Sequence, residues 1–137
     1  MKADLIDGKR IAADVRAEVA KGVAEMKARH GVVPGLAVVL VGADPASAVY
    51  VRNKQRAAAE VGMVAEDFSL PAQTGQEELL EHVGRLGADP RIHGVLVQLP
   101  LPSHINQEAV IDALNPDKDV DGLHPYNAGL LVGGRQR

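Results

Sequence analysis

The chain has 137 residues with no cysteine and no tryptophan, and its only aromatic residues are Phe68, Tyr50 and Tyr126. Without cysteine it can form no disulfide, carries no thiol nucleophile and offers no thiolate to a metal. The hydrophobic core must be aliphatic, because hydrophobic residues still make up 46% of the sequence. With aromatic rings this scarce, the placement of each tyrosine is informative.

Neither charge nor hydropathy indicates a nucleic-acid or membrane partner. The formal net charge is −3, which leaves no basic footprint for nucleic acid. No apolar run approaches the roughly 18 residues of a membrane span, and the N-terminus has no hydrophobic signal segment. The five histidines are scattered, without the spacing of metal ligands. We expect a cytoplasmic protein without a metal.

Hydrophobic periodicity alternates between helix and strand along the chain. Spacings of three and four predict a first helix over residues 8–30, whose apolar stripe is Ile11, Val15, Val19, Val23 and Met26. Continuous apolar runs predict buried strands at 35–42 and 93–102, and a looser alternation predicts a strand at 63–71. The other helices are expected at 47–61, 75–86, 106–114 and around 126–132.

Local signals mark several ends of these elements. Gly31 suits a C-terminal cap, Asp44-Pro45 an N-cap followed by proline at the first helical position, and Thr74 with Glu77 a capping box. The alternation predicts an α/β fold, a three-layer α-β-α domain with a mostly parallel sheet. We expect residues 1–137 to form one domain, and the abrupt end suggests a fragment of a longer protein.

Candidate functional residues follow the first and third strands, where open α/β sheets bind ligands. Tyr50 and Lys54 lie four apart in a predicted helix and therefore share a face. A lysine on a partly buried wall can transfer protons near neutrality, and a tyrosine ring can stack on an aromatic ligand. Gln98 lies within the apolar run at 93–102, where its amide needs a partner, and Lys54 is one candidate. Spacing alone leaves open a solvated lysine, a packing tyrosine and a satisfied core glutamine.

The segment DKDVDG at 117–122 begins like a calcium-binding loop. That loop requires a bidentate glutamate at its twelfth position, which is Ala128 here. We therefore expect a turn with functional carboxylates instead of a calcium site. The glycine-rich loops GxGxxG and GxxxxGK[ST], which bind phosphates, do not occur in the sequence.

Three motifs in this order closely resemble the N-terminal domain of the bifunctional methylenetetrahydrofolate dehydrogenase/cyclohydrolase family: VGADPASAVYVRNKQRAAAEVGM (41–63), GVLVQLPLPSHIN (94–106) and KDVDGLHPYNAGLL (118–131). The resemblance covers essentially the whole chain. It implies an oxidoreductase and hydrolase of one-carbon metabolism that serves purine biosynthesis. In that chemistry NADP oxidises 5,10-methylenetetrahydrofolate to the 5,10-methenyl cation, and water converts the cation to 10-formyltetrahydrofolate.

The resemblance also implies roles for individual residues. Lys54 corresponds to the catalytic proton-transfer residue, and Gln98 to the residue that holds and tunes it. Tyr50 corresponds to the ring that stacks on the aminobenzoyl group, and Asp121 to a hydrogen-bond partner of the pterin. The expected substrate-binding set is Tyr50, Lys54, Gln98, Leu99, Pro100 and Asp121. Leu123 departs from the family, where phenylalanine is common after DVDG.

Family members are about twice as long, and their second half is a Rossmann-type domain that binds NADP. We therefore expect no cofactor site and no dehydrogenase activity in this chain alone. Family members form homodimers largely through that second domain, so the oligomeric state of this chain stays open. Three hypotheses remain: a catalytic folate-side domain, a folate-binding module without activity, and a stand-alone cyclohydrolase.

Overall fold

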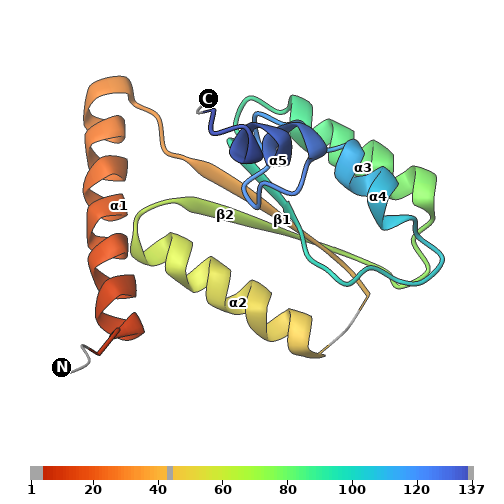
Figure 1. The fold of residues 1–137 in the computed structure, drawn as a ribbon, viewed down its shortest axis with the longest axis horizontal. Helices are drawn as coiled ribbons and strands as arrows, with labels where there is room; N and C mark the ends of the chain where they lie inside the picture. The colour runs from red at the N-terminus through yellow and green to blue at the C-terminus, as the bar shows by residue number, and fades with distance from the viewer. Residues whose placement is uncertain (1–4, 43–44, 136–137) are drawn as a thin grey trace.

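The structure is a computed structural model that describes residues 5–42 and 45–135. Helices and strands alternate along most of the chain (Figure 1). The elements are α1 (Gly8–His30), β1 (Gly35–Val41), α2 (Pro45–Glu60), β2 (Val64–Leu70), α3 (Gln76–Ala88), β3 (Gly94–Val97), α4 (Gln107–Asp112) and α5 (Pro125–Val132). In the described ranges, no helix is long and apolar enough to cross a membrane.

The three strands form a parallel sheet in the order β2-β1-β3. β1 pairs along its whole length with β2, from Gly35 opposite Val64 to Val41 opposite Leu70. β1 is buried at six of its seven positions, whereas most β2 side chains are half-buried. The continuous apolar run of β1 is thus explained by a strand covered on both faces.

The two faces of the sheet have separate cores. On one face, side chains of β1 and β3 pack against α3 and α4, with Leu79 and Val110 fully buried. On the other face, Val38, Leu40 and Leu96 pack against Val51 of α2. Figure 1 shows α2 on one side of the sheet and α3 and α4 on the other. The predicted three-layer α/β fold with a parallel sheet is confirmed.

Helix α1 begins and ends where the sequence predicts. The Asp7 carboxylate accepts hydrogen bonds from the backbone of Lys9 and Arg10, and Gly31 adopts a left-handed φ of 68°. Its apolar stripe is less buried than the periodicity suggests. Of the stripe, only Val23 is buried, and the other four side chains are 40–52% exposed. The reason is that α1 lies at one end of the sheet and packs mainly on the end of α2 (Figure 1).

Two local predictions are wrong. The capping box does not form: Gly75 is the N-cap of α3, and the Thr74 hydroxyl bonds no described residue. Thr74 instead closes a turn with Pro71, and its carbonyl oxygen lies 2.9 Å from His104 Nε2. The third strand is shorter than predicted and ends at Val97, so Gln98 lies just beyond it. The predicted N-cap Asp44 lies outside the described residues.

Replacement of Leu79 by alanine tests the core between α3 and the sheet. Leu79 is fully buried, so Leu79→Ala should lower the free energy of unfolding by about 2–5 kcal/mol through lost transfer energy and a cavity. Urea unfolding followed by circular dichroism measures this. Leu131→Ala, at a side chain that is 80% exposed, is the matched control and should change it by less than about 0.5 kcal/mol. Equal effects of the two substitutions would contradict the described core.

Candidate functional site

The candidate site lies on the α2 face of the sheet at the carboxyl end of β3, where Val97 pairs with Val39 in the middle of β1. Pro45 is the first residue of α2, a position where its missing N–H costs no hydrogen bond. Tyr50 lies about one and a half turns later and Lys54 about one turn beyond it. The two residues lie on the same side of the helix, and both line a groove between α2 and α1. The parallel order of β1 and β3 brings the residue after β3 next to this helix face.

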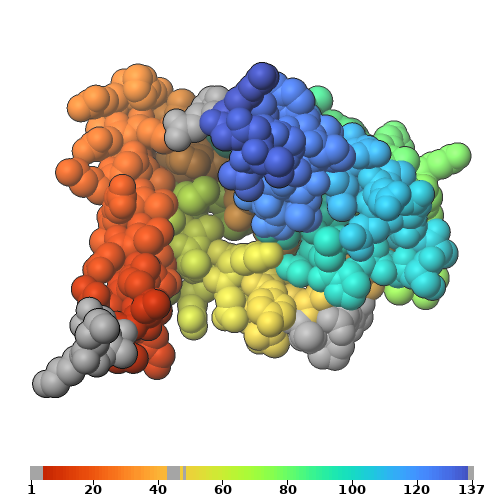
Figure 2. Space-filling model, in the orientation of Figure 1, coloured from red at the N-terminus to blue at the C-terminus, as the bar shows by residue number. Residues whose placement is uncertain are grey.

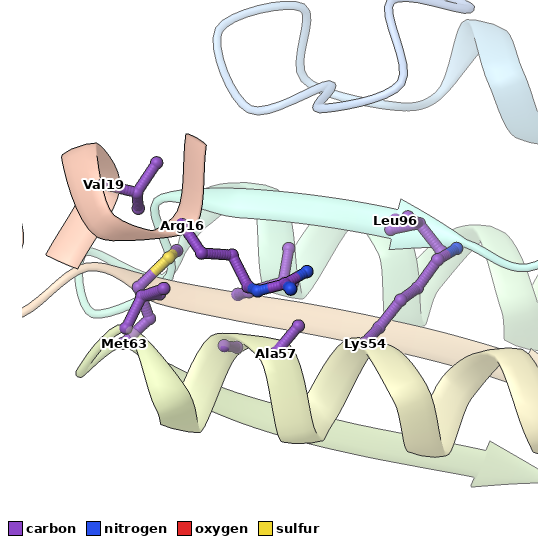
Figure 3. A pocket seen from close by; sticks show the side chains of 9 residues that line it. Arg16, Val19, Lys54, Ala57, Met63 and Leu96 are labelled. Atoms are coloured by element: carbon purple, nitrogen blue, oxygen red, sulfur yellow. The ribbon is translucent and has the colours of Figure 1, made fainter. Parts of the chain in front are cut away.

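Lys54 and Gln98 are joined by a hydrogen bond. Lys54 Nζ donates to Gln98 Oε1 at 3.0 Å, and both side chains are half-buried. Figure 3 shows the Lys54 side chain extending from α2 to the level of Leu96 on β3. The contact between Lys54 and Gln98 that the sequence suggested is therefore present in the fold. An ammonium group has three N–H donors, so two remain for other partners.

Gln98 is held at both its backbone and its side chain. Its backbone N–H donates to Val39 O of β1 at 2.8 Å. Its side-chain Nε2 donates to the carbonyl oxygen of Leu99 at 2.8 Å. Because a carbonyl oxygen can only accept, the NH₂ group must face Leu99, and Oε1 is left to face Lys54. The orientation of the amide thus follows from the chain itself.

The surroundings of Lys54 form a groove with two parts. The apolar part has a volume of about 300 Å³ and lies over Leu36, Leu96, Val61 and Met63. The polar part, about 420 Å³, follows the outer face of α2 from Tyr50 to Glu60. Arg16 of α1 and Lys54 border both parts. The groove opens on the face seen in Figure 2, between α1 and α2.

The other predicted site residues, Tyr50, Leu99, Pro100 and Asp121, form no hydrogen bond with Lys54 in the described part of the chain. Tyr50 is 62% exposed and borders the polar part of the groove. Leu99 contributes its carbonyl to Gln98, and Pro100 follows it through a cis peptide bond at the surface. Asp121 is exposed. In the described part of the chain no hydrogen bond or ion pair connects Asp121 with Lys54, so the fold brings together Lys54 and Gln98 most directly.

The segment that carries Asp121 is held beside β3 by backbone hydrogen bonding. Val95 N–H donates to Lys118 O at 2.7 Å, and Val95 and Asp119 form a parallel bridge. This close approach needs glycine at position 94, since a Cβ there would collide with Val120. Asp119, the first aspartate of the DVDG motif, therefore pairs with β3 at the edge of the sheet. Asp121, the second aspartate, is exposed to solvent.

The carboxylate of Asp119 connects this segment to the start of α5 through hydrogen bonds. Its Oδ2 accepts from His124 N–H at 2.9 Å and from Asn127 Nδ2 at 3.0 Å. Asn127 Nδ2 also donates to Pro116 O at 2.8 Å. Burial alone would raise the pKa of Asp119, but the hydrogen bonds from Asn127 and from the backbone of the turn outweigh it, so its pKa lies below the ordinary value.

Sequence reasoning missed two groups of residues. Arg16, Asn53 and Arg56 line the polar groove with Lys54. The residues Asn53 and Arg56 are three and six positions after Tyr50, so helical spacing was a signal for them, whereas Arg16 comes from another helix and had none. Asp119 with Asn127 was also missed, because the role of a carboxylate that holds a turn depends on a residue eight positions away.

Comparisons with known proteins agree on one family. The sequence profile described as "Tetrahydrofolate dehydrogenase/cyclohydrolase, catalytic domain" matches residues 6–121. The chain belongs to this family. The "Bifunctional protein FolD" of Caulobacter vibrioides strain NA1000 / CB15N is 61% identical over 133 residues, which are 97% of this chain and 45% of that protein.

Solved structures share the fold. A structure of the "Bifunctional Enzyme FolD-Methylenetetrahydrofolate Dehydrogenase/Cyclohydrolase" from Campylobacter jejuni has a TM-score of 0.94 at 39% identity, and the match covers 97% of this chain and 47% of that one. The FolD of Trypanosoma brucei, solved with NADP and an inhibitor, has a TM-score of 0.92 at 38% identity over 99% and 46% of the two chains. The chain thus spans a little under half the length of these relatives.

Replacement of Asp119 by asparagine tests whether the hydrogen bonds of Asp119 stabilise the DVDG segment. Because its pKa is lowered on folding, the ionised carboxylate stabilises the folded chain above its unfolded pKa, and this stabilisation is lost as pH falls through the folded pKa. Asp119→Asn should lower the free energy of unfolding at pH 7 by about 1 kcal/mol. Urea unfolding from pH 7 down to pH 3 should show this deficit shrinking toward acid pH. Asp112→Asn, at an exposed position of α4, serves as control, and a deficit constant with pH would contradict the account.

Proposed function

We propose that residues 1–137 form the folate-side catalytic domain of a methylenetetrahydrofolate dehydrogenase/cyclohydrolase, in which Lys54 transfers protons during hydrolysis of the 5,10-methenyl cation. The observation that carries the proposal is the hydrogen bond from Lys54 Nζ to Gln98 Oε1 at 3.0 Å beside a groove that opens to solvent. Membership of the family supports it. The relatives named above are called bifunctional as whole proteins, and this chain corresponds to less than half of their length.

The chemistry of hydrolysis suits a lysine held in this way. Water attacks the amidinium carbon of the cation and loses a proton, and one of the two bonds from that carbon to nitrogen then breaks as the nitrogen gains a proton. A neutral Lys54 can take the first proton with its lone pair, and as an ammonium it can return a proton to the leaving nitrogen. The positive charge of the substrate favours the neutral amine while it is bound.

Gln98 fixes the position of Lys54 without neutralising it. A carboxylate in its place would favour the charged lysine and weaken it as a base. A neutral amide oxygen can accept an N–H from either form of the amine, so the contact persists through the proton transfer. The two hydrogen bonds that hold Gln98 itself, to Val39 and to Leu99, preorganise this contact.

The remaining predicted residues would place the substrate around Lys54. Tyr50 is a largely exposed ring one turn from Lys54, which suits stacking on the aminobenzoyl group. Asp121 is an exposed carboxylate on the segment beside β3, which suits hydrogen bonds to pterin nitrogens. Leu99 and Pro100 follow Gln98 directly in the chain, and we assign them contacts with the substrate. These assignments are part of the proposal.

NADP is the cofactor named for the trypanosomal relative, and the residues of this chain do not fit it. A dinucleotide is bound through a glycine-rich loop at a helix N-terminus, and this sequence contains no such loop. We therefore assign no part of the hydride transfer to residues of this chain. The chemistry that its own residues support is hydrolysis. A cytoplasmic location, a role in purine biosynthesis and homodimer formation by the full-length protein belong to the same proposal.

Replacement of Lys54 by methionine tests the assigned role. The chain should hydrolyse 5,10-methenyltetrahydrofolate above the spontaneous rate, and Lys54→Met should reduce that excess at least about 100-fold, the usual scale of general acid–base catalysis. The loss of the absorbance band of the methenyl compound measures the rate. Lys21→Met, an exposed lysine of α1, should leave the rate unchanged.

The same assay separates the alternatives. Binding of the cation without any turnover would identify a folate-binding module and contradict the catalytic proposal. Turnover that persists in Lys54→Met would contradict the role of Lys54. Retained binding by Lys54→Met together with lost turnover is the expected pair of results.

Replacement of Tyr50 tests the stacking assignment. Tyr50→Ala should raise the Kd for tetrahydrofolate about fivefold, since aromatic stacking contributes about 1 kcal/mol. Tyr50→Phe keeps the ring and should bind within about twofold of the original chain, because only the hydroxyl is lost. Isothermal titration calorimetry measures both. Equal affinities for the alanine variant and the unchanged chain would remove Tyr50 from the site.

A further inference from the structure

The side chain of Asn127 bonds two separate points of the segment that leads to Asp121. Asn127 lies in the first turn of α5 and is half-buried. Its Nδ2 donates to Pro116 O at 2.8 Å and to Asp119 Oδ2 at 3.0 Å. A side-chain amide has two N–H donors, and these two hydrogen bonds use both. One amide nitrogen therefore holds α5 to both ends of the segment 116–119.

These hydrogen bonds matter because α5 has little other attachment. The structure describes all eight residues of α5, and none of them is buried, so apolar packing contributes little to its position. The chain before Asp121 is held by the bridge between Val95 and Asp119, whereas the chain after it leads into α5. Polar contacts therefore set this second half of the turn. Asn127 supplies two of them, and His124 N–H supplies another to the same Asp119 oxygen at 2.9 Å.

The Asp121 carboxylate depends on this turn for its own position. It is exposed, and among residues 5–42 and 45–135 no group forms a hydrogen bond or ion pair with it. Gly122 follows with a left-handed φ of 67°, a conformation that glycine adopts readily, so the chain turns directly after Asp121. A side chain without partners lies where its backbone places it. The contacts of Asn127 thus determine where Asp121 can meet a ligand.

The residue type at position 127 follows from its two partners. Burial raises the pKa of Asp119, but hydrogen bonds from Asn127 and from the backbone lower it further, so its pKa lies below the ordinary value and the carboxylate is ionised at neutral pH. An ionised carboxylate only accepts hydrogen bonds, as does the carbonyl oxygen of Pro116. Both partners therefore require a donor. An aspartate at position 127, although of the same size, would offer them oxygen atoms alone.

We propose that Asn127 is a positioning residue for substrate binding, which acts through Asp119 to hold the Asp121 carboxylate where the pterin binds. The inference rests on the proposed function, since that function assigns Asp121 to the pterin nitrogens. Asn127 itself does not contact the ligand. Without its two hydrogen bonds the Asp121 carboxylate is still present, but its turn is free to move, and its hydrogen bonds to the pterin weaken because they are no longer preorganised.

The test is a double-mutant cycle for binding of tetrahydrofolate to the 137-residue chain, measured by isothermal titration calorimetry. Asn127→Ala should raise the Kd about tenfold, the scale of one lost hydrogen bond to a charged group, and Asp121→Ala should raise it at least as much. In the Asp121→Ala chain, the further change Asn127→Ala should alter the Kd by less than about twofold, because the carboxylate that it positions is gone. Gln107→Ala, at an exposed amide of α4, is the control and should leave the Kd unchanged.

A second variant separates the hydrogen bonds of Asn127 from the space that it fills. Asn127→Asp keeps the size of the side chain but removes both donors, so it should raise the Kd for tetrahydrofolate at least as much as Asn127→Ala does. Unchanged binding by the Asn127→Asp chain would contradict the inference.

The outcomes distinguish this inference from the proposed function. If Asn127→Ala weakens binding equally with and without the Asp121 carboxylate, Asn127 has a structural role alone and the inference is wrong. If Asp121→Ala weakens binding and Asn127→Ala does not, the inference is wrong and the proposed function stands. If Asp121→Ala leaves the Kd unchanged, Asp121 is not part of the site and there is nothing for Asn127 to position. If the unchanged chain does not bind tetrahydrofolate, the proposed function fails and the inference fails with it.

Discussion

The burial of β1 on both faces is the constraint on which the site depends. As the central strand, β1 pairs with β2 on one side and β3 on the other, and its side chains contribute to both cores. Its carboxyl end leads into α2, which carries Lys54, and its Val39 carbonyl accepts the backbone N–H of Gln98. A shift of β1 in the sheet would therefore move both partners of the central hydrogen bond.

The side chain that bonds Lys54 in the candidate site is a neutral amide, that of Gln98. Gln98 holds Lys54 through an amide oxygen, and the carbonyl of Leu99 decides which end of that amide faces the lysine. The neighbouring carboxylates are used elsewhere: Asp119 fastens a turn, and Glu60 lies between two arginines. Within residues 5–42 and 45–135, no carboxylate forms an ion pair with Lys54.

Two parts of the same groove have different physical characters. The part below Arg16 is apolar, and with the exposed stripe of α1 it presents aliphatic surface. The part along α2 is polar and cationic. Lys54 lies where the two parts meet and borders both.

The sequence by itself determined the fold class, the order of the elements and the shared helix face of Tyr50 and Lys54, because period, run length and helical spacing are local properties of the chain. It also indicated Gln98, since an amide within an apolar run needs a partner. Only the tertiary structure decided that the Thr74 capping box is absent, that four residues of the α1 stripe stay exposed, and that Arg16 joins Lys54 in one groove. Each of these depends on packing between segments that are distant in sequence, and burial and charge proximity arise only when such segments meet.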